Sequence, residues 1–207
     1  MNELMQRRRQ LMSANRALLP VEYQQVAWFQ TTESYSTKFK FETDALPKTT
    51  RRYEVDAKVD SDTSSLATAI LACVHGNNKF WQIVTNVDNP YFIFQAGGSY
   101  VGDVLKDNNR HLFVLDGLHG RCWVDNSTPL SIQVSDVDST EFYVGSRQGV
   151  VRFSAVTFFS MKVYENDVLI NYLLPCYLKS NGKNKLYDLV SKTAIGDIVN
   201  VNRGPNV

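Results

Sequence analysis

Cysteine, long apolar runs and an excess of charge of one sign are scarce in this sequence. Its 207 residues include three cysteines, Cys73, Cys122 and Cys176, which lie far apart and are odd in number. Such spacing indicates neither a disulfide framework nor a zinc site, so we expect free, buried thiols. The 22 lysines and arginines nearly balance 21 aspartates and glutamates, which leaves a formal net charge of +1. This balance argues against a nucleic-acid partner.

Membrane spans and targeting segments are also missing from the pattern. No apolar stretch approaches the ~18 residues that a membrane span needs, and no apolar run follows the basic residues near the start, as a signal peptide would require. We therefore predict no membrane insertion and synthesis in a cytoplasm. The sequence has no glycine-rich phosphate loop that opens a helix and no cysteine and histidine cluster, so we predict no cofactor.

Short segments of alternating apolar and polar residues fill most of the chain. Clusters of turn-forming residues separate them, and no helical period lies between. This pattern predicts an all-β fold in which antiparallel strands form a two-sheet sandwich. The expected strands in the middle of the chain are 51–59, 67–75, 80–86, 91–95, 110–116, 120–125, 141–145 and 151–163.

Residues 158–190 form the most informative segment. The first part alternates as a strand, and Glu165-Asn166-Asp167 supplies turn chemistry. A second strand follows, which we expect Pro175 to end. After a polar bend, the short apolar segment 186–189 is expected to bury against the sheet.

This segment resembles the final hairpin of the laminin-G-like, concanavalin A-type jelly-roll domains of bacteriophage tail and other virion proteins. The family pattern runs roughly K-I-Y-x-x-x-x-L-V-x-x-F-I-P-C, followed by a polar loop and G-L-Y-D. The matching positions are Lys162, Val163, Tyr164, Leu169, Ile170, Tyr172, Leu173, Leu174, Pro175, Cys176, Leu186, Tyr187 and Asp188.

Two other pieces carry the same resemblance. The segment after Pro20 is similar to the entry strands of the family, and 110–128 is similar to an internal hairpin with Asp116-Gly117 and Gly120 in its turn. The matches extend over about residues 20–195. Beyond Asp188 the chain departs from the family pattern, and we expect 200–207 to be loose.

The resemblance implies a concanavalin A-like jelly roll over residues 20–207 and a non-enzymatic structural protein of a bacteriophage virion, synthesised in the bacterial host cytoplasm. The implied partners are other capsid or tail proteins and further copies of the same chain. A host-surface glycan is an additional ligand if the module also serves adhesion.

Residues 1–19 form a separate N-terminal arm in this interpretation. Residues 2–14 have the pattern of a short amphipathic helix, which is marginal alone in water. Either the arm is a solvated leader, or it anchors the domain by packing its apolar stripe and pairing its arginines on a partner. The anchoring residues would be Leu4, Met5, Arg7, Arg8, Arg9, Leu11 and Met12.

A glycoside hydrolase is the enzymatic alternative. Glu54 and Asp56 share one face of the strand 51–59, and retaining hydrolases need two carboxyl groups about 5–5.5 Å apart. Jelly-roll hydrolases carry Glu-x-Asp-x-Glu on such a strand, and here Lys58 takes the place of the third acid. We therefore expect a solvated strand face and no enzyme activity.

Carbohydrate binding is the other alternative, because lectin-like domains stack sugar rings on exposed aromatic side chains. Trp81, Tyr91 and Tyr100 lie near polar loops and are the candidates, although most aromatic residues of an all-β chain belong to its core. Loop carboxylates are also possible calcium ligands, and His111 is expected to have a structural hydrogen-bonding role. The carboxylates are Asp103, Asp107 and Asp125.

Overall fold

The structure is a computed structural model, and it describes residues 19–32, 38–43, 48–60, 68–75, 79–86, 89–96, 99–102, 104–137, 139, 141–146 and 155–207. The expected N-terminal helix and its anchoring residues (Leu4, Met5, Arg7, Arg8, Arg9, Leu11 and Met12) lie outside these residues. The part that is described contains no helix with the length and apolarity to cross a membrane.

Every pairing between the described strands is antiparallel, which confirms the all-β class. Along the chain, the strands are separated at the turn-forming clusters of the sequence. The strands are β1 (Tyr23–Gln25), β2 (Phe29–Gln30), β3 (Lys38–Glu42), β4 (Arg51–Val59), β5 (Thr68–His75), β6 (Lys79–Asn86), β7 (Asn89–Ala96), β8 (Ser99–Val101), β9 (Arg110–Asp116), β10 (Arg121–Val124), β11 (Leu130–Ser131), β12 (Glu141–Val144), β13 (Val156–Glu165), β14 (Val168–Leu178), β15 (Asn184–Asp188), β16 (Thr193–Val199) and β17 (Asn202–Arg203).

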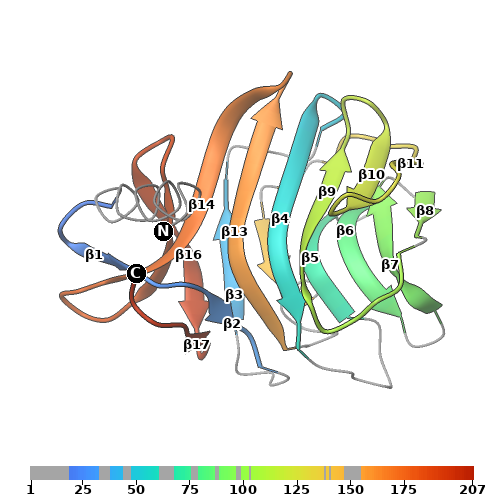
Figure 1. Cartoon of the computed structure of the whole chain (residues 1–207). Coiled ribbons are helices and arrows are strands. Elements are labelled where there is room, and N and C mark those ends of the chain that lie inside the picture. The colour runs from blue at the N-terminus through green and yellow to red at the C-terminus, as the bar shows by residue number, and fades with distance from the viewer. Residues whose placement is uncertain are drawn as a thin grey trace, which may run out of the picture.

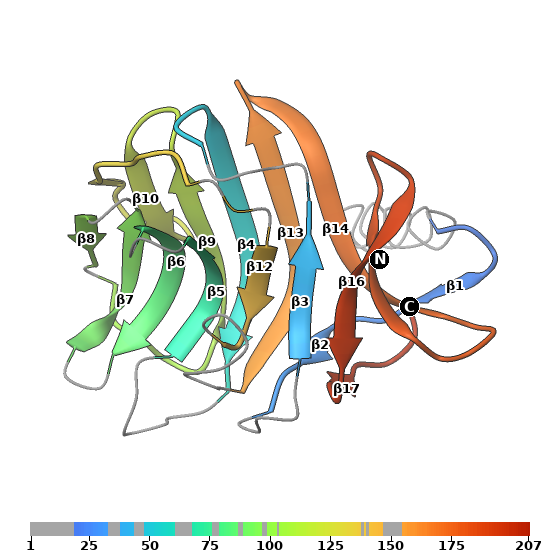
Figure 2. The same ribbon diagram turned by 180° about the vertical axis from the view of Figure 1, so that it is seen from behind.

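The strands lie in two layers (Figures 1 and 2). Hydrogen bonds connect β10, β9, β4, β13 and β14 in that order, and we call this run the first layer. A second run, β3, β12, β5, β6, β7 and β8, forms the second layer. At one edge β15 pairs with β14, β16 with β15, and β3 with β16, so the ladder continues from one layer into the other.

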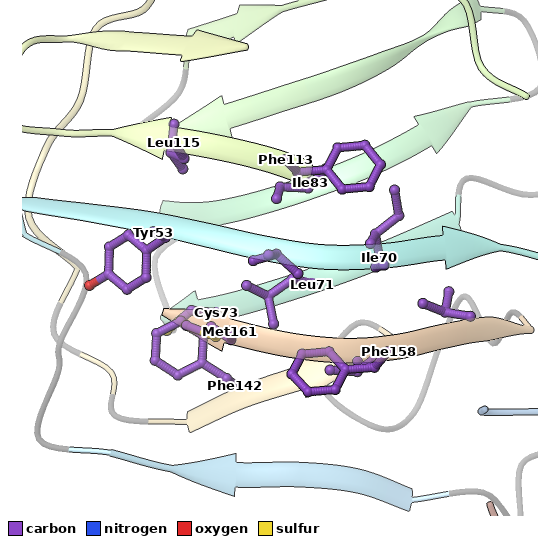
Figure 3. Close-up of a cluster of buried hydrophobic side chains, with 14 of the residues drawn as sticks. Tyr53, Ile70, Leu71, Cys73, Ile83, Phe113, Leu115, Phe142, Phe158 and Met161 are labelled. Carbon is purple, nitrogen blue, oxygen red and sulfur yellow. The ribbon is translucent and has the colours of Figure 1, made fainter. Parts of the chain in front are cut away.

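One apolar core fills the space between the layers. Tyr53, Phe113 and Phe158 reach into it from the first layer (Figure 3). The ring of Phe113 meets Phe92 of the second layer at 4.9 Å between centroids, and Phe158 meets Phe39 at 5.3 Å. Both pairs are edge-to-face, which is a favoured aromatic geometry. The inward positions of β4 are all buried, as its strict alternation predicts.

The segment that carries the resemblance forms one unit, β13–β14–β15. Asn166 and Asp167 have positive φ angles of 47° and 63°, which a tight two-residue hairpin turn requires. Asp188 is 1% exposed. Its carboxylate accepts hydrogen bonds from the backbone N–H groups of Tyr172 and Val190 and from the side chain of Asn171. This aspartate therefore fixes the end of β15 on β14.

Pro175 does not end the second strand of the hairpin, contrary to the sequence prediction. It lies inside β14, where its C=O accepts from the backbone N–H of Val26. On that side of β14 the pairing with β13 stops at Leu173, and the pairing with β1 begins at Cys176. The missing N–H of proline falls into this gap, so no ladder hydrogen bond is lost.

The expectation of a loose tail at 200–207 was wrong. β17 pairs with β2, and Asn206 forms a bridge with Val26. Gly204 packs directly on Trp28, because a Cβ atom added there would lie 2.7 Å from the indole Nε1. The C-terminal segment thus lies beside β1 and β2, the first described strands (Figure 1).

Candidate functional site

Two of the three aromatic residues proposed for sugar stacking, Trp81 and Tyr91, do not form a group. Trp81 is 3% exposed and donates from Nε1 to the carbonyl oxygen of Ser135 at 2.7 Å. Its ring also meets Tyr53 at 5.2 Å, inside the core. The prediction that Trp81 offers an exposed face is therefore corrected: two-layer packing takes this indole into the core.

Tyr91 and Tyr100 belong to β7 and β8 of the second layer. Tyr91 is half-buried near the start of β7 and bridges Leu105, whereas Trp81 faces Ala96 at the opposite end of that strand. Tyr100 occupies the register position opposite Gln95, and its side chain lies outside the described part. The structure therefore does not bring Trp81 and Tyr91 together.

A different group of polar side chains lies on the outer face of the first layer. The β4 residues that point away from the core alternate with the buried ones. Cross-strand register places them beside outward residues of β13, β14, β9 and β10. One row that crosses all five strands, which we call the outer row, reads Tyr172, Lys162, Glu54, Val114 and Trp123.

Part of this face is hollowed. A cavity of about 420 Å³, which we call the outer pocket, opens there. Ligand pockets commonly have volumes of about 300–1,000 Å³. The lining residues come from β14, β13, β4, β9 and the turn after β10, and are Tyr172, Ser160, Lys162, Glu54, Asp56, Arg110, His111, Leu112 and Asp125.

Asp56 is fully engaged by Arg110 in the outer pocket. The guanidinium donates from Nε to one carboxylate oxygen at 2.7 Å and from Nη2 to the other at 2.5 Å. Its flat face also covers the ring of Phe159, at 3.9 Å from the centroid. Phe159 is the residue at which the register between β13 and β4 shifts. The bulge thus supplies the platform for the arginine that holds Asp56.

Glu54, the other candidate acid, has a different environment. It accepts a 3.3 Å hydrogen bond from Tyr164 Oη and lies 3.4 Å from Arg52 Nε. In a glycosidase, one carboxylate acts as the nucleophile, and the environment of the other carboxyl group keeps it protonated so that it can act as the acid. Here both carboxylates lie against an arginine, Glu54 against Arg52 and Asp56 against Arg110. This arrangement suits binding better than glycoside cleavage.

His111 lies between two carboxylates at the rim of the pocket. Its Nδ1 is 2.6 Å from Asp125 and its Nε2 is 2.7 Å from Asp107. Burial of the ring opposes protonation, but the hydrogen bonds with these carboxylates raise the pKa of His111 above its ordinary value. Because a neutral imidazole carries one N–H, both bonds to ionised carboxylates form together only on the imidazolium.

This geometry accounts for two of the three carboxylates that were expected as calcium ligands. Asp107 and Asp125 do converge, but the His111 ring lies between them, and Asp103 lies outside the described part. Among the described residues no group of three histidine, cysteine, aspartate or glutamate side chains is placed to hold a metal ion. The structural role expected for His111 agrees with this geometry.

Three polar groups in the outer pocket are left with spare hydrogen-bonding capacity. Within the described part of the chain, no hydrogen bond or ion pair is made by the ammonium of Lys162 or by the hydroxyls of Ser160 and Tyr172. Lys162 Nζ lies 5.1 Å from the Tyr172 ring centroid. These groups are free to bind a ligand.

Sequence reasoning identified the acids of this site but missed its other members. Lys162 and Tyr172 were noted only as positions of the hairpin pattern, although both point outward by simple alternation. The signal that finds them is the register of β13 with β4 and β14, which pairs Lys162 with both Glu54 and Tyr172. That register depends on two bulges that the sequence does not reveal.

Comparisons with known proteins add no family. Neither a scan against models of protein families nor a search of curated proteins finds a match to this chain.

Proposed function

We propose that this chain is a non-enzymatic structural module of a bacteriophage virion, built as a concanavalin A-like jelly-roll sandwich. Residues 1–19 are the arm that attaches it to capsid or tail proteins, and 20–207 form the domain. The observation that carries the proposal is the unit β13–β14–β15. In it the residues of the resemblance pair with one another, and Asp188 of the closing motif has a defined structural role.

The position of the chain ends supports attachment through the arm. β1 pairs with the last part of β14, and the C-terminal segment lies on its other side through the Val26–Asn206 bridge. An arm that precedes Leu19 therefore joins the domain at the edge where β1 pairs with β14 and with the C-terminal segment.

Two chains test the proposal, the full chain and one that starts at Pro20. We expect both to give the circular dichroism of a β-rich protein. Only the full chain should sediment with purified virion shells or self-associate in light scattering. If the two chains are identical monomers and neither binds shells, the attachment proposal fails.

Carbohydrate binding is the second candidate function, and the outer pocket is the observation that favours it. Adhesion to a host-surface glycan is compatible with a place in the virion. The glycoside hydrolase remains the weaker alternative because Arg110 occupies both oxygens of Asp56. If the chain hydrolyses a glycan and Glu54→Gln abolishes the activity, the non-enzymatic assignment is wrong.

A further inference from the structure

We propose that the outer pocket binds an uncharged carbohydrate chain, with Lys162 and Glu54 as its central polar contacts and Tyr172 as its aromatic platform. This inference rests on the second proposed function and names its site and ligand class. It is independent of attachment through residues 1–19, so the two can fail separately.

The shape of the site suits an extended ligand. The pocket runs across the strands from Tyr172 on β14 to Leu112 on β9. Three steps between neighbouring strands make this about 14 Å. The outer row continues to Trp123 on β10, whose side chain is half-buried. Val114 of the outer row is 1% exposed, so a chain of sugar rings laid in the pocket would meet β14, β13, β4 and the Leu112 end of β9.

The polar groups match hydroxyls better than they match any ion. Lys162 is the direct cross-strand neighbour of Glu54, so a donor and an acceptor stand side by side. A sugar hydroxyl can donate to the carboxylate while a neighbouring hydroxyl accepts from the ammonium. Ser160 adds a group of either kind on the same strand. Fully ionised phosphate and carboxylate groups only accept hydrogen bonds, so they would leave the glutamate side unmatched.

The charge balance of the pocket disfavours anions and cations alike. Glu54, Asp56 and Asp125 face Arg110, Lys162 and, when protonated, His111. Arg110 is already bound through two nitrogens to Asp56. Asp125 is likewise bound to His111. The paired groups largely neutralise each other, so the pocket has no excess of either charge to attract an ion.

Apolar surface in the pocket completes the match. The Tyr172 ring is partly exposed, and Leu112 is 39% exposed. A sugar ring has hydroxyls at its edge and C–H groups on its face, so it can cover Tyr172 while its edge reaches Lys162. Amphipathic aromatic residues are suited to such contacts.

The test uses the full chain on an array of neutral, sialylated and sulfated glycans, followed by titration calorimetry with the best oligosaccharide. We expect neutral glycans to bind. Lys162→Met and Tyr172→Ala should each weaken the affinity by at least about tenfold. Lys183→Met is the matched control, because this exposed lysine lies in the turn before β15, and the affinity should not change. Tyr172→Phe keeps the ring if the alanine variant does not fold.

Other outcomes overturn the inference. Binding of sulfated or sialylated glycans alone, with a strong salt dependence, would make the pocket an anion site. Neutral binding that both pocket variants retain would place the sugar elsewhere. No glycan binding by a folded chain that still sediments with virion shells would refute this inference and leave the attachment proposal intact.

Discussion

The two faces of the first layer are built from the same strands but carry different kinds of side chains. On β4, the odd positions from Arg51 to Val59 are buried, while the even positions are partly open to solvent. The inner face meets the second layer through aromatic rings, as at Phe113 and Phe92. The outer face carries ion pairs, a cavity and uncommitted polar groups.

This difference separates stability from recognition. Burial of apolar area stabilises the fold, whereas exposed ion pairs contribute little. The inner face therefore determines whether the layer forms, and the outer face can vary its chemistry at small cost. Substitutions on the two sides of one strand should differ in size and in what they change.

The largest effect is expected for Phe113→Ala on the inner face. Phe113 is fully buried, and loss of a buried phenylalanine side chain lowers the free energy of unfolding by about 3–5 kcal/mol. Its neighbour Leu112 points outward, so Leu112→Ala should cost below about 1 kcal/mol. Urea denaturation measures both. Equal losses would mean that the two faces contribute alike.

Asp188→Ala tests whether a buried polar residue contributes to the free energy of unfolding as a buried apolar residue does. It removes an acceptor of two backbone N–H groups and the Asn171 amide, and we expect a loss of about 2–3 kcal/mol. Burial opposes ionisation, yet these hydrogen bonds lower the pKa of Asp188. The stabilisation is thus present above the unfolded pKa and is lost as pH falls through the folded one.

Asp197→Ala is the control for this aspartate. Asp197 pairs with Lys38 at the surface, and its side chain is 62% exposed. Urea denaturation should give a loss of about 0–1 kcal/mol. If Asp188→Ala costs no more than Asp197→Ala, then Asp188 does not hold β14 and β15 together.

A smaller, pH-dependent effect is expected at the rim of the pocket. The pKa of His111 is raised in the folded chain. Its contribution is therefore complete below the unfolded pKa of about 6.5 and is lost as pH rises through the folded value. Loss of one hydrogen bond lowers stability by about 1 kcal/mol. His111→Gln should remove this part of the pH dependence of urea denaturation.

Nuclear magnetic resonance of the three histidines tests the same point directly. At pH 6 the His111 ring should show protons on both nitrogens, and it should titrate above its ordinary value. His119 is the internal comparison because, among the residues that the structure describes, its ring is paired through Nδ1 alone, with Asp116. A single ring N–H on His111 at pH 6 would contradict the bridged geometry.

The smallest effect on stability is expected for Lys162→Met on the outer face. Lys162 makes no ion pair within the described part of the chain, and its alkyl stem is retained in methionine. We expect the free energy of unfolding to change by at most about 0.5 kcal/mol. A loss above about 2 kcal/mol would show that this lysine is structural and would break the contrast between the faces.

Local patterns predicted much of the fold. β4 and β9 have the limits expected from alternation alone, and β5, β6 and β7 differ by one or two residues at their ends. The candidate site was predicted less well. Glu54 and Asp56 were recognised from their shared strand face, but Trp81, which was named as a candidate for sugar stacking, is buried. An aromatic residue beside a polar loop has the same local pattern whether a second layer covers it or not.

The sequence by itself determined the all-β class, most strand positions and the outward direction of the β4 acids, because the side-chain period of a strand is a local property. The tertiary structure decided which strands are neighbours. It also set the register in which they pair, through the bulges at Phe159 and at Val163/Tyr164. In addition, it decided that Pro175 lies inside β14 and that the C-terminal segment pairs with β2. Register between distant strands depends on the packing of the whole core, and that register brings Lys162 to Glu54 and Tyr172.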